Sequence, residues 1–156
     1  MEPTAERIEL PPGYGRATST LGWAAVAERL ARAPRYWLVT LRGDGGAHVV
    51  PVDGLWLDDA WWYGGSPDTL HQRNLRRDPR VAVHLEDAMA AVVLEGSMRL
   101  VTPPPELVDR LAAASRAKYG YAPPDGAYRA GVWALRPDRA RAWSAFPTDA
   151  TRFRFA

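Results

Sequence analysis

The feature that most constrains the fold is a series of short β-branched and aromatic segments separated by turn signals rather than by helices. Such segments predict strands, and tight turns such as GDGG and DD predict hairpins between them. A parallel sheet needs a long crossover between nearly every pair of strands, and this sequence has too few helical segments to supply them. The sequence therefore predicts an α+β protein, mainly antiparallel, with about six strands in a barrel. The predicted strands or extended segments are residues 36–42, 47–57, 60–65, 81–87, 91–101, 131–137, 139–146 and the tail RFRFA.

Two or three helices are predicted between these strands. Residues 21–33 are rich in helix formers, and 103–120 begin with prolines and end at a glycine. The central helix is expected to use Ser66 as its N-cap and Pro67 as its first residue, and to continue to Asp78. Residues 1–20 are expected to form an irregular N-terminal arm, which leaves 21–156 as one domain.

Composition excludes several classes of function. The 156 residues suit one domain, and the absence of cysteine excludes disulfides, thiolate metal sites and cysteine nucleophiles. A net charge of +2 does not predict a nucleic-acid partner. No apolar run approaches the roughly 20 residues of a membrane helix, and the polar N-terminus is unlike a secretory signal. We expect a soluble cytoplasmic protein.

Familiar catalytic signatures are also missing. No serine lies in a G-x-S-x-G elbow, and no Walker or Rossmann glycine pattern occurs. The three histidines, His48, His71 and His84, are too scattered for a metal motif, so no metal site is predicted. His48 and His84 alternate with valines, which favours half-buried structural roles for both.

The start of the central helix is the best candidate for chemistry. Its backbone N–H groups and dipole favour a phosphate, and four side chains can add to it: Ser66, Thr69, His71 and Arg73. The preceding strand supplies Val50, Pro51 and Val52, and a proline of this kind indicates an edge strand or a bulge. A phosphorylated, planar cofactor is therefore chemically plausible. Not every arginine of this helix needs to bind an anion. A run of charged residues is usually a solvated helix face, and this interpretation is favoured for Arg76 and Arg77.

Four segments together resemble the pyridoxamine 5′-phosphate oxidase-like, or flavin/deazaflavin oxidoreductase, superfamily. They are YWLVTLRGDGGAHVVPV, WWYGGSPDTLHQRNLRRDPRVAVHLED, AVVLEGSMRLV and RARAWSAFPTDATRFRF, and the strongest is RNLRRDPRV at 73–81. The resemblance implies a split β-barrel that forms a homodimer, with FMN or the deazaflavin coenzyme in clefts between the two chains.

The same resemblance assigns roles to individual residues. Val50, Pro51 and Val52 would line the ring system, and Ser66, Thr69, His71 and Arg73 would hold the phosphate. Trp143 and Arg152 would approach from the partner chain, and His48 and Arg152 would shape the substrate pocket. Many relatives carry Lys or Arg where this chain has Thr69 and His71, and neutral histidine donates only one hydrogen bond.

The function expected from the resemblance is an FMN-dependent oxidoreductase that transfers hydride to or from a small organic substrate. A deazaflavin-dependent reductase is the first alternative. A non-catalytic flavin carrier or sensor, or a haem-binding module using His48, His71 or His84 as axial ligand, is the second. The basic motif that grips pyridoxamine phosphate in the true oxidases is not evident, so that reaction is not predicted.

Overall fold

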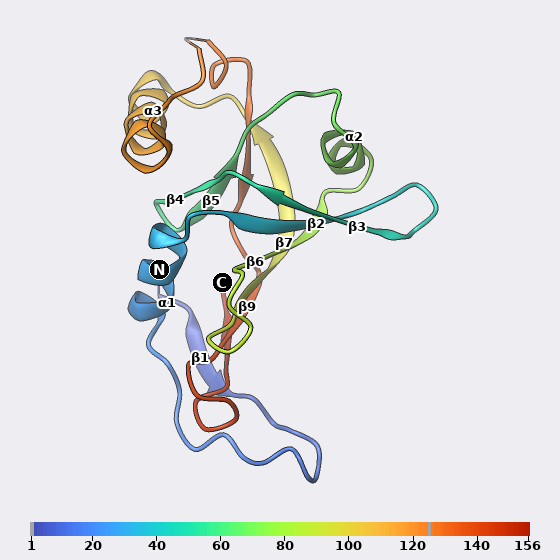
Figure 1. Ribbon diagram of the computed structural model, residues 1–156, viewed down its shortest axis with the longest axis vertical. Helices are drawn as coiled ribbons and strands as arrows, with labels where there is room; N and C mark the ends of the chain where they lie inside the picture. Colours follow the sequence, from blue (N-terminus) through green and yellow to red (C-terminus); the bar gives the residue numbers. More distant parts are fainter. Residues whose placement is uncertain (1, 125) are drawn as a thin grey trace.

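The computed structural model describes residues 2–124 and 126–156 (Figure 1). This part of the chain contains ten strands and three helices, and every strand pair is antiparallel. The predicted α+β class is confirmed. The elements are β1 (Thr4–Arg7), α1 (Trp23–Arg32), β2 (Tyr36–Leu41), β3 (Ala47–Val52), β4 (Leu55–Leu57), β5 (Ala60–Tyr63), α2 (Leu70–Arg77), β6 (Arg80–His84), β7 (Val92–Val101), α3 (Pro105–Tyr119), β8 (Val132–Leu135), β9 (Arg139–Ala142) and β10 (Thr151–Arg154).

Strand β7 connects two parts of the sheet. The main path runs β1-β10-β9-β7-β6-β2-β3, while β8, β5 and β4 branch from the second half of β7, and the sheet does not close into a complete barrel. Val92–Glu95 pair with β9, whereas Met98–Val101 pair with β8. The chain changes partner opposite Gly96, where a Cβ would lie 3.0 Å from Leu135 Cδ1 and 3.2 Å from the Asp138 backbone nitrogen. Only glycine fits this corner without displacement of its neighbours.

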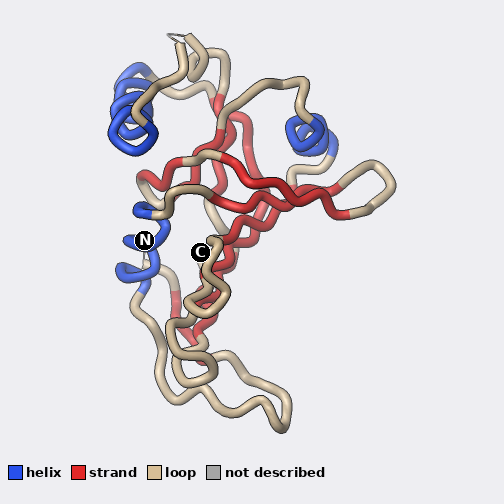
Figure 2. The backbone as a smooth tube through the Cα atoms, in the orientation of Figure 1, coloured by secondary structure: helices blue, strands red, loops and turns tan. Residues whose placement is uncertain are grey.

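The strands carry two hydrophobic clusters on opposite faces, and the helices lie at their periphery (Figure 2). Adjacent residues of a strand point to opposite faces, so Trp61 enters the larger cluster and Trp62 the smaller one. Helix α1 covers the larger cluster, where Trp23 contacts Phe153 edge to face at a centroid distance of 5.1 Å. Helix α3 covers the smaller one and ends at Gly120, whose φ of 74° is a left-handed C-cap. None of the helices described is long and apolar enough to cross a membrane.

Two predicted boundaries change. The segment 47–57 is broken at Asp53–Gly54 into β3 and β4, which pair with different strands. The segment 1–20, expected to be an irregular arm, contains β1, which pairs with β10 at the opposite end of the chain. Short N-terminal strands of this kind lack a sequence signal because the partner strand, 150 residues away, supplies their stability.

Gly54 marks a point where the backbone has no room for a side chain. A Cβ there would lie 2.4 Å from Nε1 of Trp61, which is 0% exposed. The Tyr119 hydroxyl also accepts a hydrogen bond from the Gly54 N–H (3.0 Å) and donates to its carbonyl (2.8 Å). The bend between β3 and β4 is therefore fixed from both sides.

We expect Gly54→Ala to lower the free energy of unfolding by about 1–3 kcal/mol, the usual cost of overpacking a core. Chemical denaturation measures this change. Gly43→Ala is the matched control, because its Cβ would meet only the Arg77 guanidinium at 3.5 Å, which can move. Equal denaturation midpoints for the two variants would contradict the assigned close approach.

Candidate functional site

The turn before α2 differs from its prediction. Ser66 was expected as the N-cap and Pro67 as the first helical residue, but the N-cap is Thr69 and the helix begins at Leu70. Residues 66–69 instead form a turn closed by the Thr69 N–H donating to the Ser66 carbonyl at 3.3 Å. Proline is favoured at the second position of such a turn, so the feature that indicated a helix start serves the turn instead.

The hydroxyls of this turn are occupied within it. Thr69 Oγ1 donates to the Ser66 carbonyl at 3.0 Å, and Ser66 Oγ accepts from the Asp68 N–H at 3.3 Å. Thr69 therefore makes no side-chain cap for α2. The first N–H groups of a helix have no partner inside it, so the backbone at the start of α2 keeps donors available for an anion.

The arginine run of α2 is structural for the most part. Arg73 and Arg76 donate to the carbonyls of Asp68 (2.8 Å) and Pro67 (3.2 Å), which holds the turn against the helix. Arg77 donates to the Leu41 carbonyl at 2.8 Å and so ties α2 to β2. These guanidinium groups all bind backbone carbonyls of their own chain. Arg73, predicted to hold a phosphate, is therefore engaged with the turn.

His71 and His48 meet between α2 and β3. Their rings are nearly parallel, with a centroid distance of 6.0 Å and an interplanar angle of 10°. The Tyr63 hydroxyl lies 2.6 Å from His71 Nε2. One side chain each from β3, β5 and α2 therefore converge at this point, and the predicted roles of His48 and His71 in binding stay predictions.

Charge at this junction is low near neutral pH. Burial, and secondarily the charge of His48, lowers the pKa of His71 below its ordinary value of about 6.5. Burial raises the pKa of Tyr63, so its phenol stays protonated and can donate to Nε2. His71 is therefore neutral at pH 7. It supplies no fixed positive charge to the start of α2.

Strand β3 presents its three predicted residues differently. Val50 and Val52 point to the same face as His48, and Val52 is buried in the core, whereas Pro51 is exposed on the opposite face. The three side chains therefore cannot all line one ring. Pro51 does lie on an edge strand, as predicted, because β3 ends the main strand path and pairs with β2 alone. A flat group beside β3 would meet its open backbone edge.

Trp143 and Arg152 lie elsewhere in the chain. Trp143 follows β9, and its Nε1 donates to the Ala88 carbonyl at 3.3 Å. Arg152 on β10 binds the Glu6 carboxylate at 2.8 Å. Within the described residues of one chain, neither side chain has a hydrogen bond or ion pair with His48 or His71. The role of Arg152 in the substrate pocket stays a prediction.

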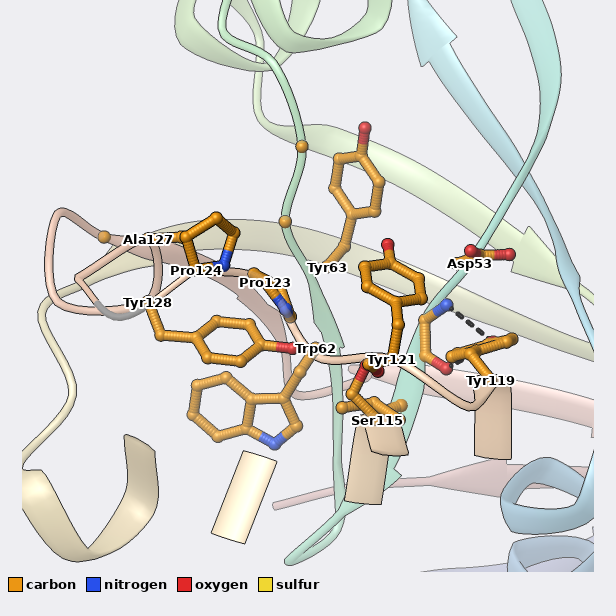
Figure 3. A pocket seen from close by; sticks show the side chains of 15 residues that line it. Asp53, Trp62, Tyr63, Ser115, Tyr119, Tyr121, Pro123, Pro124, Ala127 and Tyr128 are labelled. Atoms are coloured by element: carbon orange, nitrogen blue, oxygen red, sulfur yellow. Dashed lines mark hydrogen bonds between the residues drawn. The ribbon is translucent and has the colours of Figure 1, made fainter. Parts of the chain in front are cut away.

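A cavity of about 310 Å³ lies on the other side of Tyr63 and was not predicted from the sequence. Its walls are mainly aromatic: Trp62, Tyr63, Tyr119, Tyr121 and Tyr128 (Figure 3). The hydroxyl of Tyr63 points away from Trp62 and Tyr128, so its ring faces the cavity while its oxygen reaches His71 (Figure 3). The four tyrosines come from β5, α3 and the following loop, so they form no local sequence motif. The segment KYGYAPP at 118–124 is the one local signal of an aromatic wall.

Sequence comparison identifies the family. The model of the pyridoxamine 5′-phosphate oxidase family matches residues 23–144, most of the chain. The chain belongs to the pyridoxamine 5′-phosphate oxidase family. No curated protein matches it by sequence.

Solved structures share the fold of this family member. A conserved hypothetical protein from Mycobacterium tuberculosis is 23% identical over 82% of this chain and 88% of its own, with a TM-score of 0.66. A haem-binding protein from Mycobacterium smegmatis is 28% identical over 81% of this chain and 57% of its own, with a TM-score of 0.57. An F420 reductase is 19% identical over 84% of this chain and 98% of its own, with a TM-score of 0.57. At such identities the likeness establishes the fold.

The residues of this family member suit a weakly charged anion better than a phosphate dianion. Backbone donors remain at the start of α2, but the Thr69 hydroxyl and the Arg73 guanidinium bind the turn and His71 is neutral. Among residues 2–124 and 126–156 no three histidine or acidic side chains lie close enough to hold a metal ion. The affinity of this site for an anion therefore depends on the backbone N–H groups at the start of α2 and on the protonation of His71.

We expect anion affinity at this site to rise as the pH falls. Burial lowers the pKa of His71, so the ring gains its positive charge only below the ordinary histidine value of about 6.5, and charge-assisted hydrogen bonds contribute about 1.5–3 kcal/mol. Inorganic sulfate keeps one charge state over this range, and its affinity can be measured by NMR titration between pH 5 and 8.

His71→Lys should bind sulfate about tenfold more tightly at pH 7.5 than the parent, with little pH dependence. Tyr14→Lys is the control, because Tyr14 is 63% exposed and lies outside the site. A gain for Tyr14→Lys equal to that for His71→Lys would show that only overall charge matters.

Proposed function

We propose that this protein is an oxidoreductase that binds a flavin-type cofactor, FMN or the deazaflavin coenzyme, and transfers hydride with a small organic substrate. The observation that carries the proposal is the stacking of His48 on His71 at 6.0 Å. This contact places the donor-rich start of α2 beside the open edge of β3. A planar ring with an anionic tail needs both features in one place.

Such a cofactor, when bound, carries the redox chemistry, and the protein contributes binding and orientation. The N–H groups of α2 would hold the anionic tail. The backbone edge of β3 around Val50 would hydrogen-bond the ring, while Pro51 stiffens that edge. Tyr63 would keep the His71 ring in place through their hydrogen bond. No acid–base residue is required for hydride transfer itself.

One observation favours the deazaflavin coenzyme as the second candidate. Its phosphate is a diester with one negative charge, whereas FMN ends in a phosphate monoester that is largely dianionic at pH 7. A neutral His71 beside backbone donors balances one charge more easily than two. The fold is also shared by an F420 reductase.

A haem-binding module is the alternative that the likeness to the Mycobacterium smegmatis protein suggests. The structure brings His48 and His71 together but leaves His84 on the outer face of β6, stacked on Trp37. Only the first two histidines would then be axial ligands at the candidate site.

The cofactor proposal is tested by titrating purified protein with FMN, the deazaflavin coenzyme and haem in separate absorbance experiments. We expect saturable binding of FMN or the deazaflavin below about the millimolar range, weakened by Tyr63→Ala. Turnover with a reduced cofactor and an electron acceptor then separates an enzyme from a carrier. The proposal would be rejected if the protein bound neither FMN nor the deazaflavin coenzyme. It would also be rejected if the protein bound only haem, with a Soret band that His71→Ala abolishes.

We also propose that two chains form a dimer through the outer face of the main sheet. The register places Val49 and Pro51 of β3, Trp37 and Val39 of β2, and Ala82 and His84 of β6 side by side on this face. Val49 is 51% and Trp37 36% exposed, so neighbouring apolar side chains of β3 and β2 are open to solvent on this face. The face continues into charged residues of β7, β9 and β10, including Arg152.

An interface between identical patches related by a twofold axis suits this face. Its apolar half would be buried, and Arg152 of the charged half would be brought toward the partner's β3 edge. This arrangement supports the expectation that cofactor clefts lie between chains and that Arg152 and Trp143 reach them from the partner.

Val49→Glu should convert the dimer to monomer, because the substitution buries a charge at a self-complementary interface. Analytical ultracentrifugation measures the mass. Leu100→Glu is the control, since Leu100 is 52% exposed but lies on the second half of β7. A monomeric parent protein at tens of micromolar, or dissociation by both variants, would reject this interface.

A further inference from the structure

Several residues without a side chain line the cavity behind Tyr63. Gly64, Gly65 and Gly131 line it. Gly65 and Gly131 have φ values of 145° and 129°, which side-chain-bearing residues rarely adopt. Gly64 has no such constraint, and a Cβ there would only touch Tyr128 Cε1 at 3.9 Å. Gly65 and Gly131 therefore fix the backbone conformation of two segments of the wall, and a larger side chain at Gly64 would be directed toward Tyr128.

Hydrogen bonds hold the cavity walls in place. Ser115 Oγ donates to the Tyr121 carbonyl at 2.7 Å, which fastens the loop after α3 to the helix. Tyr119 is fixed to both backbone groups of Gly54. The Tyr63 ring is fixed by its bond to His71 at 2.6 Å. The aromatic surfaces are therefore preorganised, which lowers the entropic cost of binding a rigid ligand.

The same hydrogen bonds leave few polar groups for a ligand. The hydroxyls of Ser115, Tyr63 and Tyr119 are used in contacts within the protein. Burial raises the pKa of Tyr63, Tyr119 and Tyr128, so these phenols are uncharged at neutral pH. Recognition in this cavity must come mainly from the faces of aromatic rings.

The charge around the cavity is balanced. Among the described residues of the lining, Asp53 is the only ionisable side chain other than the tyrosines, and its carboxylate is paired with the Arg35 guanidinium at 2.9 Å. A cationic ligand would have to compete with Arg35 for Asp53. An anionic ligand would meet Asp53, and none of the described lining residues is a cation, since the Lys118 ammonium lies outside the lining against the Tyr36 hydroxyl and the Gly54 carbonyl. Both charged classes are therefore disfavoured relative to a neutral ligand.

We infer that this cavity binds a neutral, planar aromatic molecule of one or two rings. The size follows from its volume of about 310 Å³, since a cavity of roughly 150 Å³ holds one benzene. Tyr63 separates this molecule from the His48–His71 junction by one aromatic ring. That the molecule is the substrate of the oxidoreductase rests on the proposed function, but its binding does not.

Three probes of one shape and different charge test the inference: benzamide, benzoate and benzamidinium. They are titrated at pH 7.5 into protein without cofactor, and chemical-shift changes are followed by ¹⁵N NMR. We expect saturable benzamide binding in the millimolar range or tighter, with the two charged probes at least about tenfold weaker.

Two variants locate the binding. Gly64→Leu should abolish benzamide binding by filling the cavity without backbone strain. Tyr121→Ala removes one wall at a side chain that is 54% exposed, so it keeps the fold and should weaken binding severalfold. Tyr14→Ala, which alters an equally exposed tyrosine (63%) outside the cavity, is the control and should bind as the parent does.

Each other outcome overturns the inference. Tightest binding by benzamidinium would make the cavity an aromatic cage for cations, and tightest binding by benzoate would make it an anion site. No saturable binding of any probe to about 10 mM, or full benzamide binding by both Gly64→Leu and Tyr121→Ala, would remove the site. Benzamide binding in a protein that binds neither flavin would leave this inference standing and reject only the proposed function.

Discussion

The architecture depends on a single strand that pairs with different partners along its length. The first half of β7 lies between β6 and β9, and its second half pairs with β8. The exchange requires the Asp138 backbone to pass against β7 at Gly96, where it donates to the Glu95 carbonyl at 2.9 Å. Because β5 pairs with β8, this corner also decides where Tyr63 and the start of α2 lie.

Tyr63 joins the two parts of the candidate site. Its oxygen binds His71 at the anion end and its ring forms a wall of the aromatic cavity. Burial makes both ends of this contact uncharged near pH 7, because it lowers the pKa of His71 and raises that of Tyr63. The site therefore combines neutral surfaces with backbone donors, and its electrostatics differ from those expected of a cradle lined by lysine or arginine.

Sequence patterns predicted the elements better than their contacts. Alternation and turn residues identified β2, β5, β6 and β7, and proline and glycine bounded α3, because these signals are local. Ser66 and Pro67 were misassigned because serine and proline favour both helix starts and turns, and only the hydrogen bond from Thr69 decides between them. The tyrosine-lined cavity escaped prediction because its residues come from separate elements that only the fold brings together.

Pro51 affects how copies of this chain can associate. An open strand edge normally invites a further strand, since its unpaired N–H and C=O groups can extend the sheet. Proline has no N–H to offer, and its ring obstructs an incoming backbone near the C-terminal end of the β3 edge. Growth of the sheet by edge addition is therefore blocked where the apolar side chains would otherwise encourage it. The dimer proposed above would form through the face of the sheet instead of its edge, and such an assembly stops at two copies.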